Sequence, residues 1–127
     1  MFSDLIALLK TLGYQVYDTD VHETPSYPYI LVWGGVANPH PEQALSSQAD
    51  GVSDRVGVTV AAGTPAGART VHSLVRALLQ PYGFPLTVGG FQLKIRDHQP
   101  VQVDRDEIIT GTGRHPSFCV DIYSAQK

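Results

Sequence analysis

The stretch Arg55-Val56-Gly57-Val58-Thr59-Val60 alternates large apolar residues with polar or small ones. A period of two is typical of a β-strand, because successive side chains of a strand point to opposite faces of the sheet. We therefore predict that Val56, Val58 and Val60 face a core, whereas the residues between them face away from it. The decisive stretch is thus a half-buried strand.

An amphipathic segment follows this strand after a turn at residues 63–67. Four of its apolar residues occupy positions i, i+3, i+4 and i+7, which share one face of a helix: Val71, Leu74, Val75 and Leu78. Pro81 cannot continue a helix, whereas Thr64 or Pro65 suits the first turn of one. We predict a helix over residues 66–80, with a polar stripe opposite the apolar face: Arg69, His72, Ser73, Arg76 and Gln80.

The same two periodicities locate the remaining elements. A helix is predicted over residues 3–12, because Ser3 suits an N-cap and Gly13 suits a helix end. The run 29–33 is β-branched and aromatic, which indicates a buried central strand with Trp33 in the core. The alternative for Tyr27, Tyr29 and Trp33 is a role as interface aromatics. Further strands are predicted at residues 15–17, 92–98 and 117–124, the last with its even-numbered apolar residues facing inward: Phe118, Val120 and Ile122.

These elements predict an α+β fold of one domain over residues 1–127. A chain of 127 residues has the usual size of a single domain. The order of elements favours a mostly antiparallel or mixed sheet of about four to five strands, with two helices packed on one face. We expect the core between sheet and helices to contain Val58, Val60, Leu74, Leu78, Leu93, Ile95, Val120 and Ile122.

Composition and charge argue against several classes of protein. The net charge of −3, with dispersed Lys and Arg residues, provides no basic patch for nucleic-acid phosphates. The lone Cys119 has no second thiol for a disulfide, as is usual inside cells. No apolar run approaches the roughly 20 residues of a membrane span, and Asp4 stands where a secretion signal needs positive charge. We expect a cytoplasmic protein without membrane contact.

Motifs for catalysis and for metal or cofactor binding fail their spacing tests. The five histidines, His98 among them, show no metal-ligand spacing. The stretch 63–70 lies where a phosphate loop would lie, but its glycines are too close together and no lysine follows. The acidic cluster at 104–107 lacks the glycine and spaced oxygens of a calcium loop, and Cys119 is interpreted as a packing residue. We therefore predict no catalytic residue, no metal and no cofactor.

Two long polar segments and the polar stripe are the candidate contact surfaces. Residues 36–53 and 104–116 lack apolar periodicity, and connections of this length are usually functional or disordered. We expect both segments to be flexible in the isolated subunit and to become ordered in an assembly. A solvated helix face is the usual explanation of such a stripe, and a subunit contact is the alternative, because arginine suits interfacial ion pairs.

Four features follow one another along most of the chain. They are a short N-terminal helix, the strand entry Pro25-Ser26-Tyr27-Pro28-Tyr29-Ile30-Leu31-Val32, the alternating strand 54–62, and a helix ending Val75-Arg76-Ala77-Leu78-Leu79. This order resembles the small tail terminator or tail-completion proteins of long-tailed, siphovirus-type bacteriophages. The resemblance implies a virion structural protein and not an enzyme. In that family a hexameric ring caps the tail tube, stops its polymerisation and presents a surface to the head connector.

The resemblance also implies the partners and the location. The partners are other copies of the chain in a homo-oligomer, the major tail tube protein and the head-tail connector protein. The location is the head-proximal end of the virion tail, with assembly in the host cytoplasm. DNA passes through such a ring without specific binding, which an acidic lining favours. Ten polar residues are candidate subunit or tail contacts: Asn38, His40, Glu42, Gln43, Arg69, His72, Arg76, Arg105, Asp106 and Arg114.

Two alternatives stay open at this point. A head-tail joining or stopper subunit shares the general fold with a terminator and differs in its neighbour. A small ligand-binding or enzymatic α+β domain, with a site built from residues far apart in the sequence, is the second alternative, because one fold hosts many functions.

Overall fold

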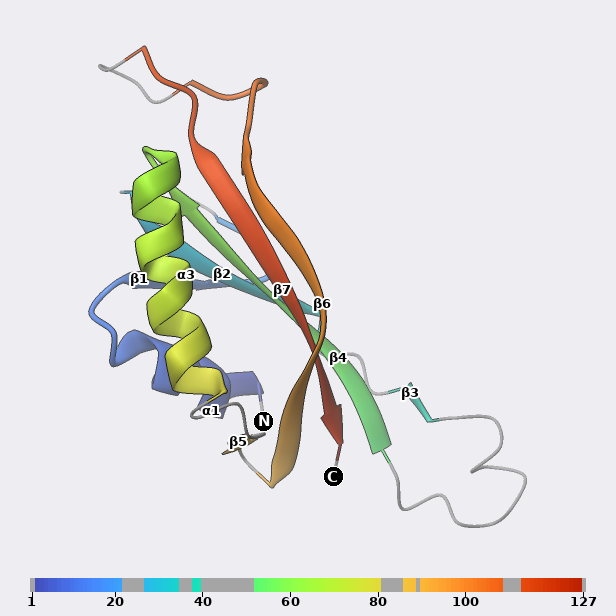
Figure 1. Ribbon diagram of the computed structural model, residues 1–127. Coiled ribbons are helices and arrows are strands. Elements are labelled where there is room, and N and C mark those ends of the chain that lie inside the picture. The colour runs from blue at the N-terminus through green and yellow to red at the C-terminus, as the bar shows by residue number, and fades with distance from the viewer. Residues whose placement is uncertain are drawn as a thin grey trace.

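The computed structural model describes residues 2–21, 27–34, 38–39, 52–80, 86–88, 90–108 and 113–126. Two helices and seven strands occupy this part of the chain (Figure 1). The helices are α1 (Phe2–Lys10) and α3 (Pro65–Leu79). The strands are β1 (Gln15–Asp18), β2 (Tyr29–Gly34), β3 (Asn38–Pro39), β4 (Val52–Ala62), β5 (Leu86–Val88), β6 (Phe91–Val103) and β7 (Ser117–Gln126).

The strands form one mixed sheet in the order β1-β2-β4-β7-β6-β5, and β3 pairs with β4 outside this path. β1 and β2 are parallel, whereas all other described pairs are antiparallel. Five of the strands are longer than three residues, and β3 and β5 are the short ones. The predicted α+β class with a mixed sheet is confirmed, and the two short strands are additions to the four or five expected.

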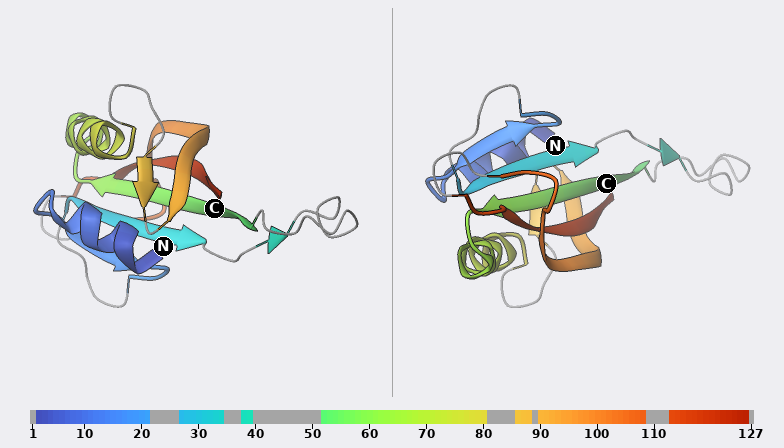
Figure 2. Two further views of the ribbon diagram at one scale, coloured as in Figure 1. Left: turned by 90° about the horizontal axis from the view of Figure 1, so that it is seen from below. Right: turned by 90° about the horizontal axis from the view of Figure 1, so that it is seen from above.

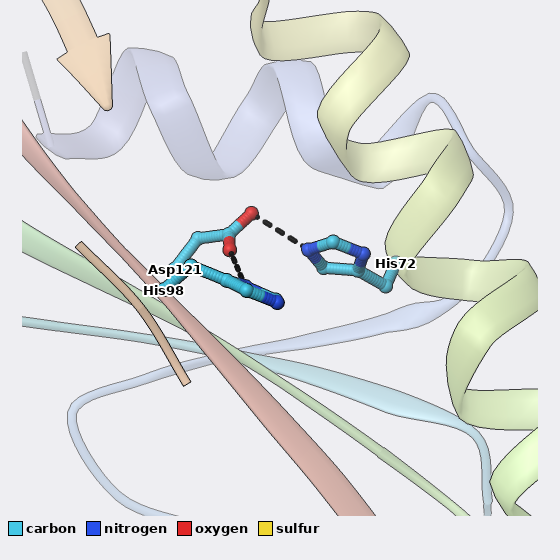
Figure 3. Close-up of side chains that lie close together, drawn as sticks. All are labelled: His72, His98 and Asp121. Atoms are coloured by element: carbon cyan, nitrogen blue, oxygen red, sulfur yellow. Dashed lines mark hydrogen bonds and ion pairs between the residues drawn. The ribbon is translucent and has the colours of Figure 1, made fainter. Parts of the chain in front are cut away.

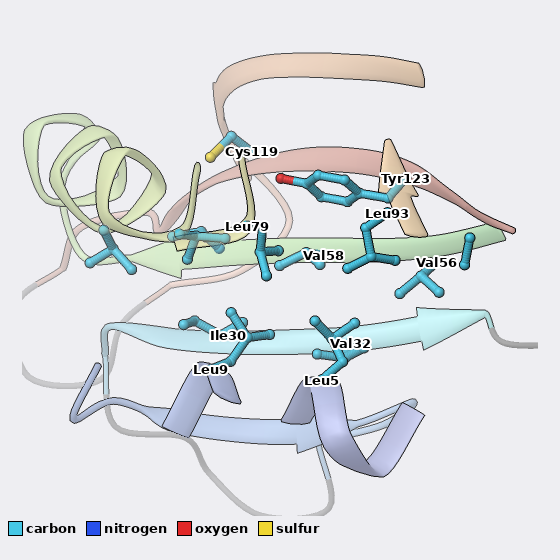
Figure 4. Close-up of a cluster of buried hydrophobic side chains, with 14 residues drawn as sticks. Leu5, Leu9, Ile30, Val32, Val56, Val58, Leu79, Leu93, Cys119 and Tyr123 are labelled. Atoms are coloured by element: carbon cyan, nitrogen blue, oxygen red, sulfur yellow. The ribbon is translucent and has the colours of Figure 1, made fainter. Parts of the chain in front are cut away.

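Both described helices pack on the same face of the sheet (Figures 1 and 2). α1 packs on β1, and α3 packs on β4, β6 and β7. Leu5 and Leu9 of α1 are buried in one cluster with Val32 and Val58 of the strands, and Leu79 of α3 joins them (Figure 4). The predicted placement of two helices on one face is therefore confirmed.

The start of α3 follows from its local sequence. Thr64 has an extended backbone conformation and caps the helix. Its side-chain oxygen accepts a hydrogen bond from the Gly67 amide at 3.0 Å. Pro65 occupies the first turn, where its missing amide hydrogen costs no helical bond. The predicted start at Thr64 or Pro65 is confirmed, and the helix ends at Leu79, one residue before the predicted end.

The predicted apolar face of α3 is wrong at Leu74, which was expected in the core. Leu74 is 42% exposed, whereas the buried residues of the helix are Ala68, Val71, Val75 and Leu79. The spacing 71, 74, 75, 78 and the spacing 68, 71, 75, 79 overlap on a helical surface, so periodicity alone does not separate them. The observed face lies nearer to the polar stripe, because His72 and Arg76 turn toward a carboxylate on the sheet.

The predicted inward face of β7 is also wrong. The residues that face the helices are the odd-numbered ones, and the buried members of this set are Ser117, Cys119, Asp121, Tyr123 and Ala125. Val58 of β4 pairs with Asp121, and Val60 pairs with Cys119, so these pairs share the face that packs under α3. Phe118, Val120 and Ile122 are partly exposed on the opposite face. In contrast, Val58, Val60 and Leu93 are buried as predicted.

Trp33 lies on the opposite face as well, and is partly exposed instead of buried in the core. Its indole Nε1 donates a hydrogen bond to Thr59 Oγ1 at 2.9 Å. The ring covers Gly57, where an added Cβ would collide with it. The glycine of the alternating strand thus makes room for an aromatic ring on the face away from the helices.

The segment 36–53, predicted as a loop, lies mostly outside the described residues. Its described parts are β3 at residues 38–39 and the first two residues of β4, which begins at Val52 instead of near Arg55. None of the helices in the described part of the chain is long and apolar enough to span a membrane.

Candidate functional site

Asp121 is the centre of the densest group of titratable side chains in the described structure. It lies in the middle of β7, between Val58 of β4 and His98 of β6. Its side chain points toward the helices, with only 1% of its surface exposed. A carboxylate at such a position needs charged or hydrogen-bonding partners, because burial of an unpaired charge is costly.

Four side chains supply those partners. Arg76 of α3 donates two hydrogen bonds to the carboxylate, from Nε at 3.1 Å and from Nη2 at 2.9 Å. His72 Nε2 lies 2.9 Å from Oδ2, and His98 Nδ1 lies 2.8 Å from Oδ1 (Figure 3). The Tyr123 hydroxyl donates to Oδ2 at 3.2 Å. We call Asp121 and these four residues the Asp121 cluster.

The charges of the cluster shift the pKa of its members. Burial alone raises the pKa of Asp121, but hydrogen bonds from His72, Arg76 and His98 outweigh it and hold that pKa well below its usual value. The hydrogen bond to Asp121 raises the pKa of Arg76, and burial raises that of Tyr123. Asp121 is therefore ionised, and Arg76 is positively charged, over the whole physiological range.

The thiol of Cys119, which lies beside the cluster, is held in its neutral form, whereas Asp121 is held in its charged form. Burial raises the pKa of Cys119 to about 11, and the charge of Asp121 acts in the same direction. A thiolate is the reactive form of cysteine, so a pKa this high keeps Cys119 unreactive near neutral pH. The interpretation of Cys119 as a packing residue agrees with its full burial.

Three members of the cluster have the donor atoms of a metal site. The candidate ligand atoms of His72, His98 and Asp121 all lie within 4.8 Å of one another. However, Arg76 contacts both oxygens of Asp121, and its positive charge opposes a cation at the same carboxylate. The arrangement is therefore an ion-pair centre that joins α3 to β6 and β7. Its two histidines, His72 and His98, are 26 positions apart in the sequence, and their spacing did not indicate that they meet at one carboxylate.

A second site lies on the face of the sheet away from the helices. It is a pocket of about 180 Å³, lined by residues of β2, β4 and β7. Asp104, Glu107 and Pro116, from the connection between β6 and β7, form the part of the lining that we call its wall. β6 and β7 are connected at one end of the sheet (Figure 1). Its principal side chains are three aromatic ones, Tyr27, Tyr29 and Phe118, and two carboxylates, Asp104 and Glu107. We call this site the tyrosine pocket.

Hydrogen bonds fix the wall of the tyrosine pocket. The Asp104 amide donates to the Pro116 carbonyl at 2.8 Å, which ties together the two ends of the loop. The Asp106 amide donates to Asp104 Oδ1 at 3.0 Å, and His115 Nδ1 lies 2.6 Å from the Glu107 carbonyl. These bonds place the two carboxylates beside the aromatic rings.

The rings and carboxylates of the pocket interact electrostatically. The Tyr27 and Tyr29 ring centroids are 5.4 Å apart, and Tyr17 adds an edge-to-face contact with Tyr29 at 5.7 Å. Burial raises the pKa of Tyr29 to about 12, with smaller contributions from Tyr27, Glu107 and Asp104. The pKa of Tyr27 is raised by the same causes, burial first. The pocket is therefore a site of negative potential.

The sequence-predicted contact residues are spread over several surfaces. Arg69, Arg105, Asp106 and Arg114 are exposed, as expected for contacts. His72 and Arg76 instead belong to the Asp121 cluster, with side chains 19% and 36% exposed. Asn38 lies in β3, and His40, Glu42 and Gln43 fall outside the described residues.

Sequence reasoning missed Asp121 altogether, and it considered Tyr27 and Tyr29 as interface aromatics without connecting them to the acidic cluster at 104–107. Asp121 was assigned to the solvent-facing side of the strand, because its apolar neighbours Val120 and Ile122 were expected to face the core. A charged residue between apolar neighbours in a central strand was the one available signal, since it faces either solvent or a buried partner. The pocket offers no such signal, because its residues come from four separate parts of the chain.

No protein-family model matches the chain, and no curated protein matches it. One solved structure, whose name states no activity, is similar over 98% of this chain and 89% of its own length. Its sequence identity is 19% and its TM-score is 0.45, values at which the similarity carries no argument about function.

Proposed function

We propose that this chain is a virion structural protein that forms a ring on the end of a phage tail tube. The ring ends polymerisation of the tube and joins the tail to the head connector. The observation that carries the proposal is the sheet face away from α1 and α3, which presents apolar and aromatic side chains that no described helix covers. The order of elements that resembles tail terminators supports the same conclusion.

The open face is unusual for a sheet in contact with water. Antiparallel sheets with one solvated face normally alternate apolar residues inside with polar residues outside. Here β2 carries Leu31 and Trp33 on the open face, and β7 carries Phe118, Val120 and Ile122, all partly exposed. A contiguous exposed apolar surface usually marks a protein interface. In a ring, the neighbouring subunit would cover this open face.

The β6–β7 loop extends this surface. Val103 is 38% exposed and Ile108 is 63% exposed, and both lie within the part of the chain that also forms the wall of the tyrosine pocket. An apolar side chain as exposed as Ile108 contributes nothing to the core of its own subunit. It is well placed for contact with another subunit or with the tube.

The Asp121 cluster has a supporting role in this proposal. It fixes α3 against β6 and β7 through charged hydrogen bonds, which are stronger than neutral ones. A rigid helix-covered layer holds the sheet, and hence the open face, in one shape. Rigid surfaces bind at a lower cost in conformational entropy.

The test measures assembly and tube length together. We expect light scattering to give the purified protein a mass that is a multiple of 13.8 kDa. Purified tail tube protein should form tubes of limited length in its presence, as seen by electron microscopy. Ile108→Lys should reduce both effects, whereas Leu74→Lys, a matched change at an exposed position on α3, should leave them near wild type.

Two results would overturn the proposal. A monomer at every concentration would exclude the ring, and tubes of unlimited length would exclude termination. Binding of a ring to the purified connector but not to tube ends would assign the chain to the connector alternative. Equal melting temperatures of the two lysine variants establish that any difference reflects contacts and not folding, because surface substitutions usually change stability by less than about 0.5 kcal/mol.

A further inference from the structure

We propose that the tyrosine pocket binds the guanidinium group of Arg69 from a neighbouring copy of the chain. This inference rests on the proposed ring and names the contact that holds one subunit to the next. It assigns a site to the open face and gives that site a ligand of stated chemistry.

The pocket has the chemistry of an organic-cation site. Its aromatic rings, Tyr27, Tyr29 and Phe118, present π-faces that attract a cation within about 6 Å. Asp104 and Glu107 stand at the wall and add two negative charges. A planar guanidinium stacks on an aromatic ring and donates paired hydrogen bonds to a carboxylate, and thus fits both parts of the pocket.

In the described part of the chain, no ion pair is identified for either carboxylate of the pocket. The ion pairs identified there all involve Asp121. Glu107 is exposed, and no hydrogen bond or ion pair of its side chain with another described residue is identified. Asp104 accepts one bond, from a backbone amide. Hence, among the described residues, no identified ion pair neutralises the negative charge beside the aromatic rings.

The dimensions of the pocket agree with this ligand. A volume of about 180 Å³ holds a side-chain head group and is smaller than the pockets of about 300 Å³ or more that enclose drug-sized molecules. The pocket is also continuous with the open sheet face through Tyr29 and Phe118. A subunit that covers this face therefore reaches the pocket at the same time.

A closed ring restricts where the cation comes from. Head-to-tail contacts in a ring join two different surfaces of each subunit, so the donor lies away from the pocket. The helices lie on the opposite face of the sheet. Their exposed basic side chains for which no ion pair with a described residue is identified are Lys10 on α1 and Arg69 on α3. Of the two, arginine matches the aromatic and carboxylate lining better.

The experiment is a charge-reversal cycle measured by sedimentation of the full-length protein. Glu107→Arg and Arg69→Glu should each weaken assembly at least about tenfold, because each leaves like charges facing one another. The double variant should recover most of the loss, because it restores the pair in reverse. Lys10→Glu makes the same charge change on the other helix and should have little effect.

Two further measurements guard against indirect effects. Glu107→Gln should leave the melting temperature of the subunit nearly unchanged, since this side chain is exposed and surface substitutions usually change stability little. Added salt should weaken assembly of the wild type more than that of Glu107→Gln, because salt screens exposed ion pairs.

The outcomes separate this inference from the proposed function. A ring that assembles equally well in all four charge variants, or a double variant without recovery, would overturn the pocket contact and leave the ring in place. A wild-type protein that stays monomeric would overturn both.

Discussion

The carboxylates on the two faces of the sheet differ in burial and in the number of partners that they contact. On the helix-covered face, Asp121 is almost completely buried and accepts hydrogen bonds from an arginine and a tyrosine, with two histidines beside it. On the open face, Glu107 lies beside aromatic rings, and no ion pair of its side chain with a described residue is identified. The same functional group thus holds the subunit together in one place and is available to another molecule in the other.

This difference teaches where stability and recognition are located. A charge that is fully paired inside the subunit contributes to folding and has little left to offer a ligand. A charge without an internal partner contributes little to folding and can direct binding. Substitutions on the two faces are therefore expected to affect different measurements.

The largest effect is expected at Asp121. Asp121→Ala removes the common partner of Arg76, His72 and His98 and leaves positive charge facing a cavity. Removal of one member of a buried pair costs about 3 to 5 kcal/mol. Chemical denaturation should show this loss, with Asp106→Ala, a change at an exposed acidic residue, as control. Equal stability of the two variants would mean that the buried carboxylate is not structural.

A somewhat smaller effect should distinguish the two sides of α3. Leu79 is fully buried and Leu74 is 42% exposed, although the sequence pattern placed Leu74 in the core. We expect Leu79→Ala to lower the free energy of unfolding by about 2 to 5 kcal/mol. Leu74→Ala should lower it by about 0.5 kcal/mol or less. The reverse order in thermal or chemical unfolding would restore the helix face inferred from sequence.

The smallest effect concerns pH. The pKa of Asp121 is lower in the folded chain than its unfolded value of about 3.9, so the folded state favours the ionised form. This contribution is present above about pH 4 and is lost as the pH falls through the folded pKa, with a slope of at most about 1.4 kcal/mol per pH unit.

The matched variant for the pH measurement is Asp121→Asn, which keeps the shape and removes the titration. Between about pH 5 and pH 2, the wild type should lose more stability than this variant. Parallel curves for the wild type and Asp121→Asn would show that the cluster does not stabilise the ionised aspartate.

Much of the secondary structure followed from residues close together in the chain. The alternation at 55–60 predicted β4, and the cap at Thr64 with the later apolar spacing predicted α3. The face of a strand or helix that is buried was harder to predict than the strand or helix itself. β7 has apolar residues at even positions and a mixture of small, charged and aromatic residues at odd ones, and the apolar set was wrongly placed inside.

The sequence by itself determined the two described helices, the five longer strands, their order and the α+β class of this protein, because strand and helix periodicities depend on neighbours a few residues apart. Only the tertiary structure decided which faces are buried and which side chains meet. His72 and His98 reach Asp121 across 49 and 23 residues of chain, through strand pairing and the rotation of α3. The tyrosine pocket likewise combines residues of three strands, β2, β4 and β7, with the approach to β2 and the connection between β6 and β7. Such contacts depend on register and helix orientation, which local spacing does not fix.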